Sequence, residues 1–199
     1  MCSTRLKSIS PRAALRAGWI GFLLSVAYII AGVAFHHSAI SVFRQANPDL
    51  TENASYNAYP WRVTIFIWRV TCEEGGNWHC AHVNVLRTRP EDLSTQSAVR
   101  IESRWIARAA EEEEEKVFKW FAMDQVRPVY FQEFGRNVVE FHDMRYGLLP
   151  DEVESLWCAR VSYDLNGHRP HVEKKMNTNR ADMTIGGLFQ RLGDYLGSP

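Results

Sequence analysis

The 199-residue chain lacks an excess of charge of either sign, because 23 basic residues balance 23 acidic ones. It also lacks a stripe of lysine and arginine with interleaved aromatic residues, so no nucleic-acid partner is expected. Internal repeats are absent as well. A chain of this length holds one ordinary domain plus an appendage.

The common motifs of catalysis and metal binding are also missing. There is no H-E-x-x-H zinc motif, no G-x-S-x-G nucleophile elbow and no glycine-rich phosphate loop. His36 and His37 are adjacent and project about 100° apart on a helix, so they cannot share one metal face. The five glutamates at 111–115 have no His or Asp within one turn and are predicted to form a solvated helical face. The sequence therefore predicts no catalytic residue, no metal ligand and no cofactor.

Cysteine is scarce, with four in the chain and no C-x-x-C spacing. Cys72 and Cys80 flank a predicted hairpin turn in TCEEGGNWHC. A three-residue loop would place them opposite each other, where they could be bridged, whereas a two-residue loop would put them on opposite faces of the hairpin. Two unpaired thiols are favoured, and the bridge is the alternative.

Charged residues are missing from one long segment near the N-terminus. Residues 1–16 carry four basic residues and no acidic one, and residues 17–43 carry no Asp, Glu, Lys or Arg. The apolar stretch GWIGFLLSVAYIIAGVAF (18–35) nearly crosses a hydrocarbon core of roughly 30 Å, and its neighbours can extend the span. The basic flank favours a cytoplasmic N-terminus. We therefore expect a basic cytoplasmic tail over 1–16 and a transmembrane helix over 17–44.

This arrangement predicts a single-pass protein of the inner (cytoplasmic) membrane whose C-terminal domain lies in the periplasm. A cleaved signal peptide is the alternative, because Gly32-Val33-Ala34 has the small residues of a cleavage site. The apolar stretch is longer than a usual signal-peptide core, and its helical pattern continues through HHSAISVFRQA (36–46). The uncleaved anchor is therefore favoured.

The rest of the chain predicts an α+β domain with a mostly antiparallel β-sheet and one or two helices. Residues 45–60 are rich in Asn, Pro and small residues and are predicted to be a linker, followed by a soluble domain over 61–199. Strands are predicted from β-branched and aromatic content, and helices from apolar residues at helical spacing. The predicted strands are 61–72, 78–87, 128–134, 137–146 and 156–165, with turns at Gly75-Gly76 and Gly135-Arg136, a loop over 89–97, and helical segments over 107–124 and 181–197.

The stretch FHDMRYGLLP (141–150) carries two charges where a strand normally carries apolar residues. Asp143 and Arg145 are two positions apart, so in a strand over 137–146 their side chains share one face about 7 Å apart. Buried charges persist only when they are paired and hydrogen-bonded. We therefore expect an ion pair that fixes the strand end and the following turn. An anion-binding site and a subunit contact are the alternatives.

An ordered series of short motifs resembles a known family. Residues 64–69 (TIFIWR) correspond to N-x-L-L-W-R, and residues 119–122 (KWFA) correspond to R-W-F-S. Residues 143–150 (DMRYGLLP) correspond to D-x-R-Y-x-x-L-P, and residues 155–157 (SLW) correspond to P-L-W. In this order and spacing, from about residue 15 to the end, the chain resembles the C-terminal portion of the inner-membrane metal-dependent hydrolases of the YdjM/YfhP type.

The resemblance implies a family but no active site in this chain. The metal-binding signature of that family lies upstream of everything present here, so no ligand is carried over, and Thr64 and Ala122 depart from the motifs. The implied protein is membrane-anchored and has no complete active site in this chain. Two alternatives stay open: the chain is the C-terminal piece of a longer or split gene, for which another membrane chain could supply the missing helices, or it is a shortened relative without the hydrolase core. A non-catalytic, membrane-anchored sensing or protein-interaction module is the alternative. The residues of a candidate structural or binding network are Asp143, Arg145, Tyr146, Trp68, Arg69, Trp120 and Trp157.

Overall fold

The computed structural model describes residues 11–51, 54–61, 64–147, 155, 157–164 and 171–176. Its strands form two antiparallel four-stranded sheets, sheet A with the order β1-β2-β3-β4 and sheet B with the order β5-β6-β7-β8. The predicted α+β class with one long N-terminal helix is confirmed. The elements in chain order are α1 (Pro11–Ala46), β1 (Ser55–Pro60), β2 (Ile67–Glu74), β3 (Asn77–Asn84), a 3₁₀ turn η1 (Pro90–Asp92), β4 (Gln96–Ala98), α2 (Arg104–Ala109), α3 (Glu113–Phe121), β5 (Val126–Glu133), β6 (Arg136–Asp143), β7 (Trp157–Tyr163) and β8 (His171–Met176).

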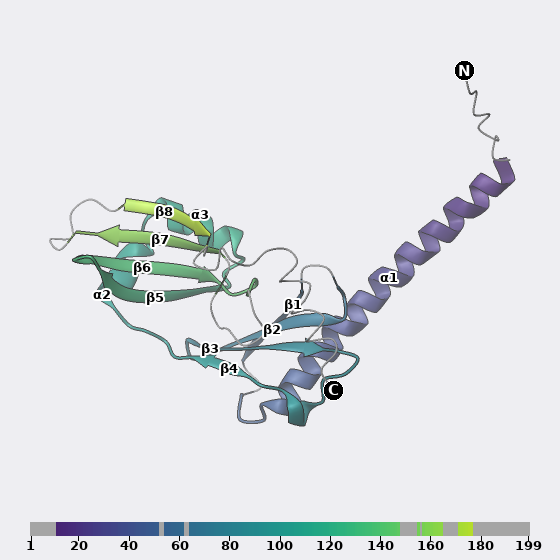
Figure 1. The fold of residues 1–199 in the computed structure, drawn as a ribbon, viewed down its shortest axis with the longest axis horizontal. Helices are drawn as coiled ribbons and strands as arrows, with labels where there is room; N and C mark the ends of the chain where they lie inside the picture. Colours follow the sequence, from purple (N-terminus) through teal and green to yellow (C-terminus); the bar gives the residue numbers. More distant parts are fainter. Residues whose placement is uncertain are drawn as a thin grey trace, which may run out of the picture.

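The first helix, α1, has two parts with different surroundings. Its N-terminal part projects away from the sheets (Figure 1), and the large apolar side chains of that part are exposed. Its C-terminal part packs on sheet A, where Ala39 and Phe43 are fully buried. By length and composition α1 is able to cross a membrane, a test that signal sequences near an N-terminus also pass. The helix ends at Ala46, two residues before Pro48.

Sheet A begins inside the segment predicted to be a linker. β1 occupies Ser55–Pro60 and pairs along its length with β2. The strand predicted over 61–72 is wrong at its start, because β2 begins at Ile67. The main-chain N of Trp61 bonds to Ile67 O at 2.8 Å and Thr64 N bonds to Trp61 O at 3.0 Å, so the chain turns here instead of extending. The predicted loop over 89–97 contains η1 and the start of β4, a short strand that pairs with β3.

The hairpin of β2 and β3 turns at Gly75-Gly76 as predicted, and both residues have positive φ, 59° and 82°. A two-residue loop of this kind favours glycine at both positions. The register places Cys72 opposite His79 and Cys80 opposite Thr71. The two thiols therefore lie on opposite faces of the hairpin, and both are buried and free. The expectation of two unpaired thiols is confirmed.

The helical segment predicted after Ala107 consists of two short helices, α2 and α3, whose apolar side chains cover one face of sheet B. Ser103 caps α2 by accepting a hydrogen bond from Trp105 N at 3.2 Å. Trp105 and Phe118 are buried in a cluster completed by Val139, Phe141, Ala159, Val161 and Tyr163 of the sheet. The solvated face predicted for 111–115 is wrong at Glu115, which is 2% exposed.

Sheet B contains the second predicted hairpin, turned at Phe134-Gly135 one residue earlier than expected. β6 ends at Asp143, three residues before the predicted strand end. β7 confirms the strand predicted over 156–165 within a few residues at each end, and β8 is a strand that the sequence analysis does not predict. The predicted helix over 181–197 lies outside the described residues.

Candidate functional site

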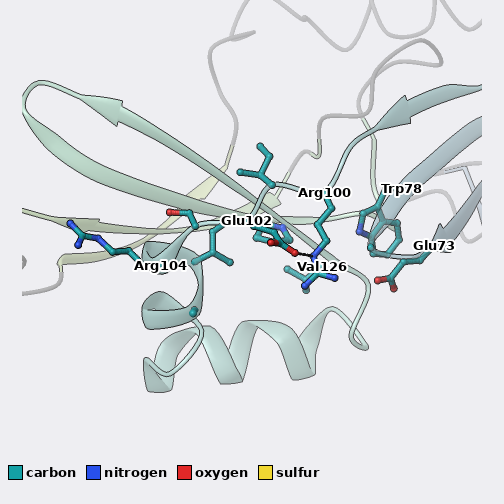
Figure 2. A pocket seen from close by; sticks show the side chains of 12 residues that line it. Glu73, Trp78, Arg100, Glu102, Arg104 and Val126 are labelled. Atoms are coloured by element: carbon teal, nitrogen blue, oxygen red, sulfur yellow. Dashed lines mark ion pairs between the residues drawn. The ribbon is translucent and has the colours of Figure 1, made fainter.

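An open cleft of about 820 Å³ lies between the tip of the β2–β3 hairpin, the segment that leads into α2 and the start of β5. Figure 2 shows Arg100 and Glu102 meeting within it, with Arg104 pointing away. Arg100 Nε and Glu102 Oε1 are 3.5 Å apart. The apolar part of the lining consists of Trp78, Ile101, Ile106, Val126 and Pro128. This volume is in the range of ligand-binding clefts, and no motif predicts it because its lining comes from separate segments.

A buried network lies at the turn that follows β6, and Asp143 closes that turn. Asp143 Oδ1 accepts hydrogen bonds from the main-chain N of Arg145 at 3.0 Å and from its Nε at 2.9 Å. Asp143 Oδ2 accepts from Nη2 of Arg145 at 2.7 Å. Aspartate favours such turns because its side chain reaches the backbone two residues on. The predicted ion pair is therefore formed, but within a turn and at hydrogen-bond distance, not along a strand face.

The pair is shielded from water, since Asp143 is 0% and Arg145 6% exposed. The two-pronged contact is the geometry in which a guanidinium and a carboxylate bind most strongly. The hydrogen bonds that the Arg145 side chain donates to the Asp143 carboxylate raise the pKa of Arg145, so its guanidinium stays charged. Both carboxylate oxygens are occupied by Arg145. Asp143 is therefore placed to hold the turn, and its geometry is unlike that of a general base, which needs a free oxygen toward a substrate.

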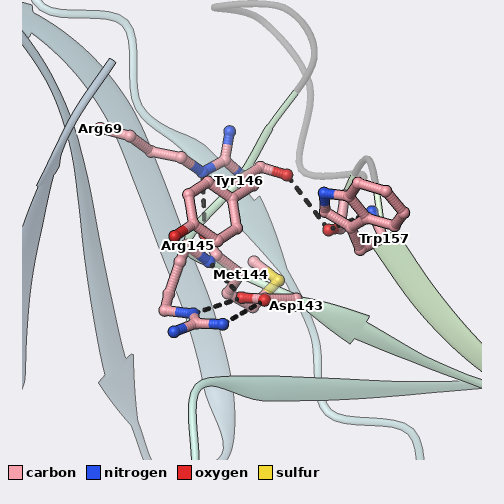
Figure 3. Close-up of polar contacts among 7 residues, drawn as sticks. Arg69, Asp143, Met144, Arg145, Tyr146 and Trp157 are labelled. Atoms are coloured by element: carbon pink, nitrogen blue, oxygen red, sulfur yellow. Dashed lines mark hydrogen bonds and ion pairs between the residues drawn. The ribbon is translucent and has the colours of Figure 1, made fainter. Parts of the chain in front are cut away.

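Arg69 reaches this turn from sheet A and is 1% exposed. Its Nε donates to the main-chain O of Met144 at 2.9 Å, and its Nη2 lies 3.7 Å from Cys80 Sγ. Figure 3 shows Arg69 approaching Met144 from one side and the Asp143–Arg145 pair on the other. Burial lowers the pKa of Arg69, while the nearby Cys80 and Asp143 raise it. The guanidinium also lies so close to Gly147 that a Cβ there would be 1.6 Å from Nη1.

The side chain of Trp68, the residue before Arg69, lies on the opposite face of the same strand. Its side chain is 6% exposed and belongs to the core cluster with Ala39 and Phe43 of α1. Its ring centroid is 5.5 Å from that of His36. Adjacent residues in a strand point to opposite faces. The Trp68-Arg69 pair therefore connects α1 on one side of β2 with the turn of sheet B on the other.

Aromatic rings complete the surroundings of Arg145. Its guanidinium carbon lies 5.1 Å from the ring centroids of Phe121 and of Tyr146, within the range of cation–π attraction. Tyr59 of β1 is also close, since Asp143, Arg145 and Tyr146 affect its ionisation, and burial raises its pKa to about 12. Neither Phe121 nor Tyr59 is predicted from the sequence as a member of this network. Phe121 stands directly after Trp120 in the K-W-F-A motif, which is the signal that could have located it.

Two of the predicted network residues lie outside the group around Arg145, whose Tyr146 is itself 43% exposed. Trp120 is 79% exposed on α3. Trp157 is 43% exposed and is linked through its main chain, because its N donates to Ser155 Oγ at 3.1 Å and Ser155 Oγ donates to Tyr146 O at 3.1 Å. The structure thus brings together Arg69, Asp143, Arg145 and Tyr146, and places Trp68 on the other face of β2.

Within the part of the chain that the structure describes, no group of three or more His, Cys, Asp or Glu side chains could hold a metal ion. Comparisons with protein-family models, curated proteins and solved structures find no match. The relationship to the metal-dependent hydrolases therefore stays a prediction based on the motif series, two of whose motifs, those at 64–69 and 143–150, meet in space through the Arg69–Met144 hydrogen bond.

Proposed function

We propose that the chain is a single-pass inner-membrane protein with a cytoplasmic N-terminus, and that its periplasmic domain is a non-catalytic sensing or protein-interaction module. The exposed apolar part of α1 and the basic residues before it support the anchor and its direction. The partner assigned to this module is a protein, since the sequence has no lysine- and arginine-rich stripe with interleaved aromatic residues that would indicate nucleic acid.

The observation that carries the proposal is a continuous connection that runs from α1 through β2 of sheet A to the turn of sheet B. Phe43 and Ala39 of α1 are buried against sheet A together with Trp68. On the other face of β2, Arg69 is hydrogen-bonded to the turn of sheet B. Packed interiors transmit displacements because they are dense and deform little. A tilt or rotation of α1 in the membrane would therefore reach sheet B, and an event at sheet B would reach α1.

The hydrolase alternative requires helices and metal ligands beyond residues 1–199, either from a longer form of the same polypeptide or from a second membrane chain. The motifs that contain Trp68-Arg69 and Asp143-Arg145 are joined by the hydrogen bond from Arg69 to Met144, which gives both motifs a structural role. Any relative that contains this domain would share that role. An upstream reading frame with several apolar helices and an early Asp/His motif would favour this alternative over the non-catalytic module. Unrelated upstream sequence would favour the module.

Membrane fractionation tests the anchor. We expect the full chain to remain in the membrane pellet after an alkaline carbonate wash, because an uncleaved apolar helix of this length stays in the bilayer. A soluble product starting near Phe35 would instead identify α1 as a cleaved signal peptide. That product would keep Ala39 and Phe43 and hence the packing on sheet A.

The direction of the anchor can be tested with Cys2, which lies in the basic tail, while the other three cysteines are buried. In spheroplasts of a bacterial host, a membrane-impermeant maleimide should label Cys2 only after the membrane is permeabilised. Labelling of intact spheroplasts that is lost in Cys2→Ser would reverse the proposed topology.

A further inference from the structure

β5 forms one edge of sheet B, and the hairpin geometry identifies which of its main-chain groups face outward. Phe134 and Gly135 both have positive φ, 48° and 71°, as in a two-residue hairpin loop closed by Glu133 and Arg136. Hydrogen bonding to the neighbouring strand then alternates along β5. Counting back from the loop, residues 127, 129, 131 and 133 bond to β6, and residues 126, 128, 130 and 132 face outward.

Two observations agree with this alternation of inward and outward residues along β5. Pro128 has no N–H to donate and falls on an outward position. Gln125 falls on an inward position, and its main-chain O accepts a hydrogen bond from Met144 N at 2.9 Å. Among the described residues, no main-chain hydrogen bond reaches the outward groups of β5. An eight-residue edge strand whose outward main-chain groups make no such hydrogen bond is a template for another strand.

The cleft lies beside the start of this edge, because Val126 and Pro128 belong to its lining. Side chains of residues paired directly across an antiparallel ladder project to the same face of the sheet. A residue placed opposite Val126 by an added strand would therefore direct its side chain to the cleft side of sheet B.

We propose that β5 receives an extended segment of a partner protein as an added antiparallel strand, with an aromatic side chain of that segment in the cleft beside Val126. Trp78, Ile101 and Ile106 provide an apolar lining. Arg100 and Glu102 form an ion pair at the rim, and the other charged lining residues, Glu73 and Arg104, are of opposite sign. The lining therefore has no net charge, which matches an uncharged side chain. In this mode of recognition, main-chain hydrogen bonds supply affinity and the side-chain pocket supplies specificity.

A second copy of this chain does not fit as the partner. Antiparallel pairing of two β5 edges creates a two-fold axis perpendicular to sheet B. In Figure 1 the strands of sheet B and the axis of α1 both run across the view, so this rotation would turn the second α1 end over end. Two anchors of one topology cannot point in opposite directions in one membrane. The inference thus rests on the proposed membrane-anchored interaction role and names its surface.

A suitable probe is the free peptide VRPVYFQEF, the sequence of residues 126–134. Paired antiparallel about Tyr130, it places its last Phe opposite Val126, its Glu opposite Arg127 and its Arg opposite Glu133. We expect the fluorescein-labelled peptide to bind the full chain in detergent micelles saturably, as measured by fluorescence anisotropy. A peptide with Ser in place of the last Phe should bind about tenfold more weakly or worse, because it leaves the apolar lining uncovered.

Two pairs of variants of the chain locate the binding. Gln132→Pro removes an outward N–H, whereas Gln132→Ala keeps it, so only the proline variant should weaken binding, by about tenfold. Ala107→Trp places a large ring in the cleft from an exposed position of α2, whereas Ala110→Trp lies outside the cleft lining. The first should reduce binding and the second should not. Near-ultraviolet circular dichroism checks the fold of each variant.

Three results would overturn the inference: no binding of the peptide, equal binding of the Phe and Ser peptides, or binding unaffected by both Gln132→Pro and Ala107→Trp. None of these bears on the anchor, since the carbonate wash reports only on α1. If the carbonate wash releases the chain from the membrane but the chain still binds the peptide, the proposed membrane-anchored function is refuted. The proposed binding surface on β5 is then still supported.

Discussion

The guanidinium of Arg69 in β2 donates a hydrogen bond from Nε to the main-chain carbonyl of Met144, 2.9 Å away, and so joins two sheets across 75 positions of sequence. Both partners are fully or almost fully buried. The same strand presents Trp68 to α1. The dipeptide Trp68-Arg69 therefore contacts three parts of the molecule, so changes at the junction between the sheets are expected to affect its stability.

Gly147→Ala should disrupt this junction. The added Cβ would stand 1.6 Å from Arg69 Nη1 and 2.4 Å from Cζ, so the buried guanidinium must move away from Met144. Overpacking of this kind destabilises by about 1–3 kcal/mol. Thermal unfolding of the full chain in detergent, followed by near-ultraviolet circular dichroism, should show a lower midpoint. Gly32→Ala is the matched control, because nothing lies within 4 Å of its Cβ position. Equal unfolding midpoints for the two variants would mean that the Arg69 side chain moves aside without a loss of stability.

Asp143 and Arg145 should show strong coupling in a double-mutant cycle. Breaking a buried pair by changing one partner leaves a stranded charge and typically destabilises by about 3–5 kcal/mol. We expect Asp143→Asn and Arg145→Met each to lower the free energy of unfolding by about this much. The double variant should lower it by less than the sum of the two single changes. It will not be fully neutral, because Asp143 also stabilises the charge of Arg69.

The control for this cycle is the exposed pair Lys119 and Asp124, whose Nζ and Oδ1 atoms are 3.6 Å apart. Lys119→Met and Asp124→Asn should change the free energy of unfolding by less than about 1 kcal/mol each. The full chain is required for all these measurements, because Phe43 of α1 belongs to the core of sheet A. Strictly additive losses for Asp143 and Arg145 would show that they do not interact.

The sequence predicts the pairing of Asp143 and Arg145 but not its geometry. Two opposite charges two residues apart among apolar residues are expected to pair, because a buried charge needs a partner. The residue at which a strand ends depends instead on which neighbouring strand it pairs with, and that is a property of the tertiary structure. β1 is missed because its sequence SYNAYP has little β-branched content, and it becomes a strand by pairing with β2. Arg69 is identified only as part of a motif, since its partner lies 75 residues away.

The burial of Glu115 is missed for a different reason. A run of five identical residues has no periodicity of its own, so it cannot show which side chain faces the core. In α3, Phe118 lies three residues on and therefore on the same face as Glu115. The sequence does not single out Phe118, because Val117, Trp120 and Phe121 of the same helix are also apolar and are exposed in the structure.

Cys72 and Cys80 should both remain unmodified in the native protein. They lie on opposite faces of the hairpin and are 0% and 2% exposed, and burial raises the pKa of Cys72 to about 11. Because the thiolate is the reactive form, iodoacetamide at pH 8 should alkylate these residues only after denaturation. Peptide mass spectrometry without reducing agent measures this directly. A mass 2 Da lower for the linked peptides, as a disulfide requires, would contradict the register of β2 and β3.

Glu115 should make the protein less stable as the pH rises from about 5 to 8. Burial raises the pKa of its carboxyl from 4.5 to about 8, with Lys119 opposing the shift, and its Oε2 is buried without a hydrogen-bond partner. Below pH 4.5 both the folded and unfolded states are protonated at this group. Between the two pKa values the unfolded chain releases the proton and the folded protein retains it, so the free energy of unfolding falls; above about pH 8 the contribution is constant.

Glu115→Gln removes this titration while keeping the size of the side chain. We expect the free energy of unfolding of the variant to exceed that of the unmodified chain by a few kcal/mol at pH 8, and to differ little from it near pH 4.5. Glu114→Gln, on the exposed side of the same helix, should follow the unmodified chain at every pH. Chemical denaturation in detergent at pH 4.5, 6 and 8 measures all three proteins. If Glu115→Gln and the unmodified chain have parallel pH profiles, the carboxyl is ionised in the folded protein, and α3 packs less tightly on sheet B than its buried Phe118 indicates.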